Sequence, residues 1–375
     1  MRIPFNKPFL TGKEAHYLYQ AVYSGKISGN GLFTKKCQSF FEEKYSFNKT
    51  LLTTSCTDAL EMAAILIDIK PGDEVIMPSY TFVSTSNAFV LRGAKIVFAD
   101  SNELNPNIDP EKIEALVTNK TKAIVVVHYA GIACDMDRIN TVAKKHNLFV
   151  IEDAAQAIDS FYNGKPLGSC GDLSSFSFHE TKNIISGEGG LLAINNTEFS
   201  DRAEIIWEKG TNRSAFFRGE VDKYGWVDIG SSFLPSEIVA AFLYAQLENL
   251  ELIQKRRKFI WGFYYGNLID IENKSIITLP NIPSFATNNA HMFYMVCNSI
   301  EERAALIKHL REDGIHAVFH YLSLHKSSFY ANKHDGRALI NCERYADCLV
   351  RLPMYYELSD AELSHICISV KRFYS

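Results

Sequence analysis

The sequence predicts an α/β protein built on a mostly parallel seven-stranded sheet, followed by a smaller α+β C-terminal domain. Between residues 50 and 195, short β-branched or apolar runs alternate with longer segments that have helical spacing. This alternation is typical of parallel strands joined by helices. The runs are apolar almost without interruption, as expected of strands that are covered on both faces. Beyond about residue 275 the alternation gives way to a mixed pattern with fewer elements.

The expected elements follow from this pattern in order. A first helix is expected to begin at Thr11, because Thr11 and Glu14 match a capping box. The strands of the sheet are expected at 51–54, 74–77, 95–99, 123–127, 148–152, 173–178 and 190–194. Helices are expected at 56–68, 81–92, 110–118 and 135–146, and a long helix or a bent pair at 235–266. The C-terminal part predicts strands at 292–296 and 317–321 on either side of a helix at 301–312.

These patterns divide the chain into an N-terminal segment (1–30), a large ligand-binding domain (31–265) and a small C-terminal domain (266–375). The formal net charge of −4 offers no basic surface for nucleic acid. No apolar run reaches the roughly 18–20 residues that span a bilayer, and the N-terminus lacks the apolar core of a secretory signal, so we expect a cytoplasmic protein that binds no membrane. The eight cysteines form no C-x2-C pair, which argues against a zinc site.

Three expected strand ends carry polar groups. Ligands of α/β sheets bind where loops leave the carboxyl ends of the strands. After the first strand, Cys56 and Thr57 open a helix whose free amides suit a phosphate. After the fifth, Asp153 ends an apolar run, where a carboxylate needs a cationic or hydrogen-bonding partner. After the sixth, a glycine-containing loop carries Lys182, and a desolvated lysine is a nucleophile for carbonyl groups.

Each of these features alone also has an ordinary explanation, as a helix cap or an exposed lysine. Together they suit pyridoxal phosphate (PLP), whose phosphate, pyridine nitrogen and aldehyde need a cradle, an acid and an amine. Four segments appear in a fixed order: SCTDAL (55–60), PSYTFVST (78–85), EDAAQA (152–157) and SFSFHETKN (175–183), the last followed by EGG. In this order they resemble the sugar aminotransferases of the DegT/DnrJ type. The resemblance runs from PFNKP near the start to LPMYYELS at 352–359.

The resemblance implies an aspartate-aminotransferase-like fold (PLP fold type I), PLP as the cofactor with pyridoxamine phosphate as its aminated form, and a homodimer with shared active sites. It makes Lys182 the residue that binds the cofactor aldehyde and Asp153 the partner of the ring nitrogen. The other cofactor contacts that it implies are Gln156 to the 3′-oxygen, Phe82 on the ring face, and Cys56, Thr57 and Ser177 to the phosphate. In the family, a partner-chain Asn usually completes the phosphate contacts; this chain has Ser232 there.

Substrate contacts are also implied by the resemblance. His320, Tyr321 and His325 match the family's His-Tyr-x-Pro-Leu-His loop, although Ser323 replaces its proline. Lys26 and Arg213 are further candidates for the diphosphate or the sugar. Both histidines could equally form structural hydrogen bonds.

Residues 71–98 and 208–232 are similar to the branch of the family that aminates C4 of dTDP-4-keto-6-deoxyglucose with glutamate as donor. The expected product is dTDP-4-amino-4,6-dideoxygalactose, for cell-surface polysaccharides such as lipopolysaccharide or the enterobacterial common antigen. Amination at C3 or of another keto sugar stays open. Three other classes of protein fit the sequence less well. A scaffold protein that keeps the fold would be expected to lose Lys182 or Asp153, and a dehydratase relative would carry His at 182, but this chain has both Lys182 and Asp153. A Rossmann oxidoreductase would need a G-x-G-x-x-G after the first strand, which this chain lacks.

Overall fold

The computed structural model describes residues 2–375 and contains a seven-stranded sheet in the order β1-β9-β8-β5-β4-β2-β3. Strand β9 is antiparallel to β1 and β8, and the other pairs are parallel. This confirms the predicted mostly parallel sheet, and each strand ends within two residues of its expected bounds. The strands are β1 (Lys49–Thr53), β2 (Glu74–Pro78), β3 (Lys95–Ala99), β4 (Thr121–Val127), β5 (Phe149–Asp153), β8 (Leu173–Ser177) and β9 (Gly190–Ile194).

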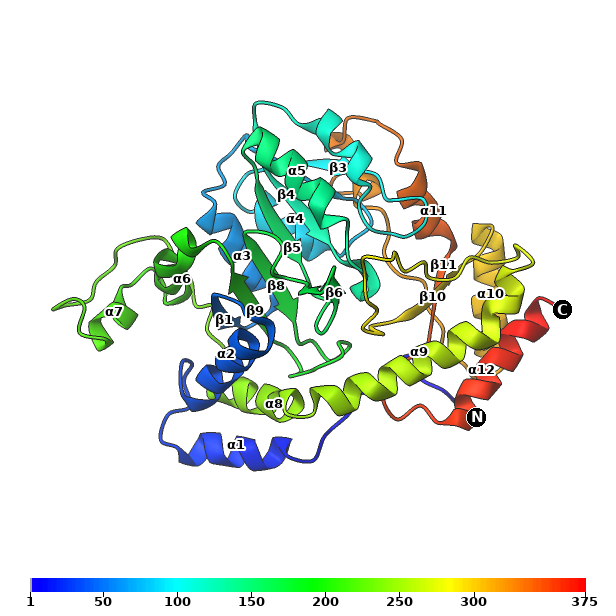
Figure 1. Ribbon diagram of the computed structural model, residues 1–375, viewed down its shortest axis with the longest axis horizontal. Coiled ribbons are helices and arrows are strands. Elements are labelled where there is room, and N and C mark those ends of the chain that lie inside the picture. Colours follow the sequence, from blue (N-terminus) through cyan, green and yellow to red (C-terminus); the bar gives the residue numbers. More distant parts are fainter. Residues whose placement is uncertain (1) are drawn as a thin grey trace.

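Helices cover both faces of this sheet (Figure 1). Side chains alternate between the faces along each strand. In β4, Val125 packs into one buried apolar cluster and its neighbours Ile124 and Val126 into the other. The first cluster includes α3 (Cys56–Leu66), α4 (Val83–Val90) and α6 (Ser200–Trp207), and the second includes α2 (Leu32–Tyr45), α5 (Met136–His146) and α8 (Glu237–Leu247). Burial on both faces explains why the strand sequences are continuously apolar.

A third apolar cluster lies in the C-terminal part of the chain. It forms around the antiparallel pair β10 (Phe293–Val296) and β11 (Leu349–Leu352), with α10 (Ile300–Glu312) and α12 (Asp360–Phe373). The long helix α9 (Leu250–Glu272) contributes Ile253 to the second cluster and Ile260 to the third. The proposed domain limit at 265 falls within this helix, so the division stays an interpretation.

The remaining helices are α1 (Glu14–Tyr23), which packs on α8, α7 (Arg213–Phe217), which projects from the body of the molecule in Figure 1, and α11 (Ile340–Cys348). Two short strands, β6 (Phe161–Tyr162) and β7 (Lys165–Pro166), form a separate hairpin. Single 3-10 turns occupy Pro110–Lys112, Glu114–Leu116, Tyr129–Gly131, Thr197–Phe199, Leu324–Lys326 and Ala331–Lys333. Among residues 2–375, no helix combines the length and the apolar character needed to cross a membrane.

Three local predictions were wrong. The first helix begins at Glu14, because the Glu14 carboxylate accepts hydrogen bonds from the amides of Thr11 and Gly12, which wrap around it before the helix starts. The expected helix at 110–118 is two 3-10 turns, which bury Ile113 between exposed neighbours. The expected strand at 317–321 is reduced to a single bridge between Val318 and Arg351. Beyond that bridge the chain turns toward the large sheet.

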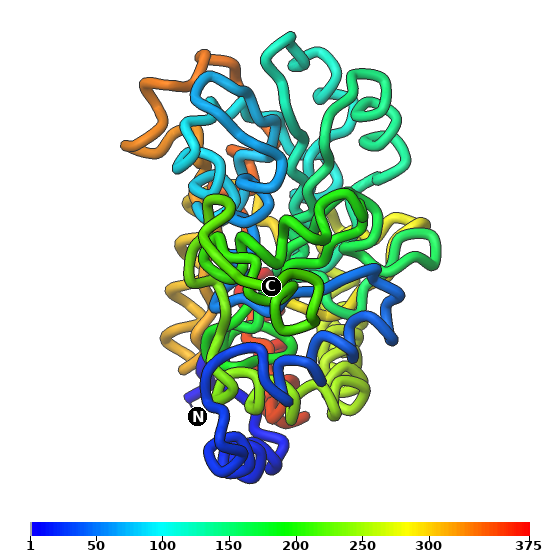
Figure 2. The backbone as a smooth tube through the Cα atoms, turned by 90° about the vertical axis from the view of Figure 1, so that its left-hand side faces the viewer, coloured from blue at the N-terminus to red at the C-terminus, as the bar shows by residue number. Residues whose placement is uncertain are grey.

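The segment that follows this bridge reaches the large sheet. In Figure 2 the orange segment around residues 325–340 lies beside the cyan and light-blue segment around residues 70–110. The amide of Leu324 donates to the carbonyl of Ser79 at 3.0 Å. Further on, the Tyr330 hydroxyl bonds the backbone of Ile96, accepting from its amide at 2.6 Å. These contacts hold residues 320–325 over the carboxyl end of β2.

The N-terminus of α2 is held by a buried carboxylate from another helix. Glu237 opens α8, and its side chain accepts from the amides of Gly31, Phe33 and Thr34 at 2.7–3.1 Å and from the Thr34 hydroxyl. A Cβ on Gly31 would lie 2.5 Å from this carboxyl group, so a larger residue there would push the carboxylate out of place. The negative charge compensates the free amides and the positive end of the helix dipole.

Candidate active site

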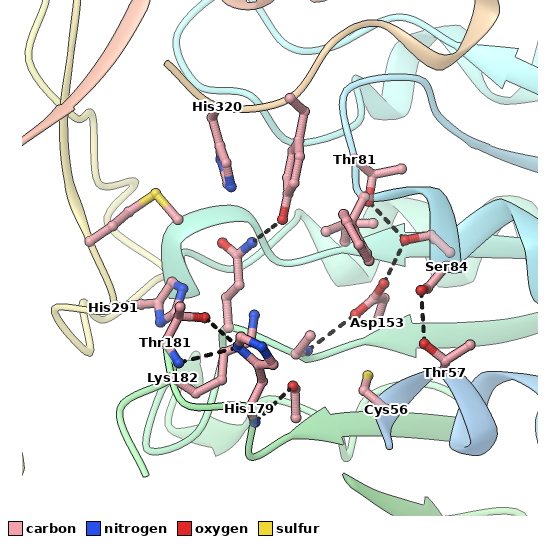
Figure 3. Close-up of a pocket in the computed structure, with 18 of the residues that line it drawn as sticks. Cys56, Thr57, Thr81, Ser84, Asp153, His179, Thr181, Lys182, His291 and His320 are labelled. Carbon is pink, nitrogen blue, oxygen red and sulfur yellow. Dashed lines mark hydrogen bonds between the residues drawn. The ribbon is translucent and has the colours of Figure 1, made fainter. Parts of the chain in front are cut away.

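A cavity of about 570 Å³ lies at the carboxyl ends of the parallel strands. Figure 3 shows Asp153 and Lys182 together in it. Its lining combines residues from the loops after β1, β2, β5 and β8, which meet at one edge of the sheet because these strands are parallel. Nine of the predicted site residues line it: Cys56, Thr57, Phe82, Asp153, Gln156, Ser177, Lys182, His320 and Tyr321.

The two acids at the end of β5 point to opposite faces of the sheet. Glu152 is fully buried away from the cavity, where it accepts hydrogen bonds from His128 Nε2 and from the amides of Gly168, Cys170 and Gly171 at 2.6–2.8 Å. Asp153 therefore faces the cavity, as expected from strand alternation. The hydrogen bonds of Glu152 tie β5 to His128 and to the loop 168–171, which is a structural role, whereas Asp153 is available to a ligand.

Asp153 is buried, and its partners are few. Burial raises the pKa of its carboxyl group, against hydrogen bonds from Thr85 and the Ala155 amide. The Thr85 hydroxyl donates to Oδ2 at 2.7 Å, and Thr81 is in turn bonded to Thr85 at 2.8 Å. A buried carboxylate in this state needs a further cation, and a protonated ring nitrogen is one that fits.

Lys182 lies in the loop after β8. The next residue anchors this loop, because the Asn183 amide donates to Gln254 at 2.8 Å and to the Asn289 carbonyl at 2.9 Å. Within residues 2–375 the Lys182 amine has no hydrogen-bond or salt-bridge partner. Burial lowers the pKa of this amine, and a negative charge on Asp153 opposes the shift. A lowered pKa increases the neutral, nucleophilic fraction of the amine.

The start of α3 forms a polar cradle beside these two groups. Ser55 caps the helix by accepting from the Asp58 amide at 3.1 Å, and the first-turn amides that follow have no helical partner. Gly190 lets β9 approach closely, since a Cβ there would lie 2.4 Å from the Cys56 nitrogen. The hydroxyl of Thr57 donates to Ser84 at 2.8 Å. Free amides and hydroxyls in this arrangement suit the phosphate of PLP.

His320 and Tyr321 form an aromatic wall of the cavity. Their rings stack with centroids 3.5 Å apart, and the Phe82 ring lies 6.2 Å from that of Tyr321. Burial lowers the pKa of His320 well below its usual value, so its imidazole is neutral. Gln156 donates to the Tyr321 hydroxyl at 3.1 Å, and its oxygen accepts from the Ala130 amide at 2.6 Å. The Gln156 amide nitrogen carries two N–H donors, so one remains for a cofactor oxygen beside the bond to Tyr321.

Four predicted residues do not line this cavity. Both ring nitrogens of buried His325 are bonded within the chain, to Ser79 at 2.8 Å and to Glu343 at 3.2 Å, so a substrate contact by His325 would have to replace one of these bonds. Lys26 and Arg213 line a second cavity of about 620 Å³. Ser232 is exposed and forms an isolated bridge with Glu208.

Other residues of the site were missed by sequence reasoning. Thr81 and Thr85 lie four residues apart in TFVST, a spacing that could have indicated a shared helix face. Arg351 is a single charge within the apolar run Leu349–Leu352, which is also a detectable signal. His291 has no such signal: it is buried in the cavity wall by a hydrogen bond of 2.8 Å to Asn183, which is distant in sequence.

Comparisons with known proteins agree with this geometry. The model of the DegT/DnrJ/EryC1/StrS aminotransferase family matches residues 9–371. The chain is 33% identical to the GDP-perosamine synthase of Escherichia coli O157:H7, over all of this chain and 99% of that protein. It is 32% identical to the spore coat polysaccharide biosynthesis protein SpsC of Bacillus subtilis, over 98% and 96% of the two chains.

Solved structures show the same fold. The putative sugar aminotransferase Spr1654 of Streptococcus pneumoniae in its PMP form superposes with a TM-score of 0.91 at 27% identity, over all of this chain and 98% of that one. Its PLP form gives a TM-score of 0.90. These similarities confirm the predicted PLP fold type I and the predicted enzyme class. The chain belongs to the DegT/DnrJ/EryC1/StrS aminotransferase family.

Proposed function

We propose that this enzyme uses PLP to transfer the amino group of glutamate to a keto sugar linked to a nucleotide. The observation that carries the proposal is the presence of Lys182 and Asp153 in one cavity beside the cradle at the start of α3. The cofactor is PLP, which agrees with the PLP and PMP forms of Spr1654. When bound, PLP supplies an electron sink and carries the amino group between the two substrates.

The residues of this chain then have distinct roles. With PLP bound, the Lys182 amine would hold its aldehyde. Once freed by the donor, the same amine would act as the base that takes the Cα proton of glutamate and then as the acid that gives this proton up. Asp153, oriented by Thr85, keeps the ring nitrogen protonated. Cys56, Thr57 and Ser177, which line the cavity, would hold the phosphate, and Phe82 would cover the ring. His320 and Tyr321 line the side on which the sugar enters.

The finer proposal concerns the sugar. The stretches 71–98 and 208–232 favour amination at C4 of dTDP-4-keto-6-deoxyglucose, and SpsC favours a product used in a surface polysaccharide. A GDP-linked keto sugar is the second candidate, because the GDP-perosamine synthase of E. coli O157:H7 is 33% identical along the whole chain. Both reactions would use cytoplasmic nucleotide sugars.

We also propose that two copies of this chain build the active sites together. The segment from 208 to 232 carries Ser232 and exposes large apolar side chains, with Trp226 86% and Phe217 67% accessible. Apolar surface of this kind is usually covered by a partner. A second copy seated there would bring Ser232, Lys26 or Arg213 to its neighbour's cavity, as the family resemblance implies.

The test separates cofactor chemistry from sugar identity. The purified enzyme with PLP is mixed with glutamate and followed by absorbance, and is then supplied with dTDP-4-keto-6-deoxyglucose or its GDP-linked counterpart, with the product identified by mass spectrometry and NMR. We expect glutamate to bleach the cofactor band and one sugar to restore it. Lys182→Ala should lose both changes, whereas exposed Lys165→Ala should keep them. Bleaching without any aminated sugar would reject the substrate, and wild-type turnover by Lys182→Ala would reject the mechanism.

A further inference from the structure

One arginine in the cavity has no anionic partner among the described residues. Arg351 is the single arginine that lines the cavity among the described residues, and its Nε is buried without a hydrogen bond. Within residues 2–375 no carboxylate lies within salt-bridge distance of it. Its polar contact is a long one, from Nη2 to the Phe319 carbonyl at 3.4 Å, and its guanidinium lies 4.6 Å from the ring centre of Phe5. A dehydrated cation without an anion is costly, which indicates an anionic ligand.

Two other arginines of this chain, Arg257 and Arg303, have structural roles and serve as a comparison for Arg351. Arg257 is buried, but its Nε and Nη2 donate to the carbonyls of Ala290 and His291 at 3.0 and 2.6 Å. Arg303 also has a buried Nε without a partner, yet its Nη1 donates to the Ala346 carbonyl at 2.7 Å and it lies outside the cavity. Arg351 differs from both because its free donors border the ligand space.

The position of Arg351 is fixed by backbone pairing on both sides. It lies in β11 opposite Tyr294 of β10. On its other side, its amide donates to the Val318 carbonyl at 2.8 Å, and its carbonyl accepts from the Val318 amide at 3.1 Å. The guanidinium is therefore presented to the cavity from a rigid strand, which lowers the entropy lost when a ligand binds.

Three anions could meet this cation: the cofactor phosphate, the nucleotide diphosphate and the donor carboxylate. The phosphate cradle is at the start of α3 and does not include Arg351. Arg351 and Lys182 line the same cavity, and the charge of Arg351 adds to the effect of burial in lowering the pKa of Lys182. The α-carboxylate of glutamate is attached to the carbon on which Lys182 acts, so a cation near Lys182 is suitably placed for it.

We propose that Arg351 binds the α-carboxylate of the amino-acid donor, an assignment that rests on the proposed function. A guanidinium offers two parallel N–H donors that match a carboxylate. Lys182 and Asp153 are then engaged by the cofactor, and Arg351 is the cation left in the lining for the donor. The keto sugar lacks a carboxylate, so Arg351 distinguishes the two half-reactions.

The test compares the half-reactions in Arg351→Gln, Arg351→Lys and the matched control Arg303→Gln, all as PLP-loaded enzyme. The glutamate concentration that half-bleaches the cofactor band is measured, together with the corresponding value for the aminated nucleotide sugar and the calorimetric affinity for glutarate. Removal of a charge-assisted bidentate contact is expected to raise the glutamate value about tenfold or more. The corresponding concentration of the aminated nucleotide sugar should change by less than about threefold. Arg351→Lys should recover part of the lost glutamate binding, and Arg303→Gln should resemble the wild type.

A second readout distinguishes the α-carboxylate from the γ-carboxylate. The amine 4-aminobutyrate keeps the γ-carboxylate but lacks the α-carboxylate. The preference of the enzyme for glutamate over this amine should fall in Arg351→Gln and remain in Arg303→Gln. An unchanged preference, an unchanged glutamate value, or an equal loss in both half-reactions would overturn the assignment. If the wild-type enzyme binds PLP but glutamate never bleaches it, the proposed function fails instead.

Discussion

The Thr85 hydroxyl donates a hydrogen bond to Asp153, the carboxylate that faces the cavity, and replacing Thr85 by valine tests this bond alone. The two side chains have nearly the same shape, so Thr85→Val removes the 2.7 Å hydrogen bond to Asp153 Oδ2 with little repacking. Burial already raises the pKa of Asp153, and the Thr85 bond is the first of the interactions that oppose this rise. Without it, the ionised form of Asp153 becomes less favourable, and its pairing with a ring nitrogen weakens.

The magnitude follows from the kind of hydrogen bond lost. A bond to a charged group contributes about 1.5–3 kcal/mol, which corresponds to a roughly 10- to 150-fold weaker binding of the cofactor. Thr81 offers an internal comparison, because it bonds the Thr85 hydroxyl and not the carboxylate. A neutral bond contributes about 0.5–1.5 kcal/mol, so Thr81→Val should weaken binding by roughly 12-fold at most.

The assay is fluorescence titration of the apoenzyme with pyridoxamine phosphate, which binds without a covalent bond to Lys182. Thr85→Ser keeps the hydroxyl and should bind like the wild type. The reasoning would be refuted if Thr85→Val bound within twofold of wild type, or if Thr81→Val lost more affinity than Thr85→Val.

Three further predictions follow from other buried or exposed groups. Because the folded-state pKa of Asp153 is raised, its ionisation destabilises the apoprotein as the pH rises through that pKa. Asp153→Asn should therefore have a higher melting temperature than the wild type at pH about 7, and the difference should shrink toward pH about 4. Equal melting temperatures at neutral pH would contradict this. Glu237→Gln leaves the Phe33 amide without an acceptor and should lower the free energy of unfolding by about 2–4 kcal/mol in urea titrations. The control Glu248→Gln breaks a partly exposed pair with Lys13 and should lower it by less than about 1 kcal/mol. Equal urea midpoints for the two variants would argue against the capping role of Glu237. Light scattering should give a dimer for the wild type and a shift toward monomer for Trp226→Ser, and a monomeric wild type would end the proposal of shared sites.

Most of the large sheet could be predicted because its strands are local signals. Each is a short apolar run between helical segments. A strand that is buried on both faces needs apolar residues whichever strands lie beside it. The order of the polar strand ends also placed Cys56, Asp153 and Lys182 at one edge, since parallel strands end together. The strand expected at 317–321 failed because its apolar residues pair with β11 at one point and then turn to deliver His320 and Tyr321 to the cavity.

The sequence by itself determined the sheet, the family motifs and the residue types that can hold PLP. Only the tertiary structure decided that Glu152 is a structural carboxylate while Asp153 faces the ligand, that His325 is already bonded, and that Arg351 and His291 join the site. The physical reason is that strand formation depends on neighbours along the chain, whereas the availability of a polar group depends on which distant donors and acceptors fold against it.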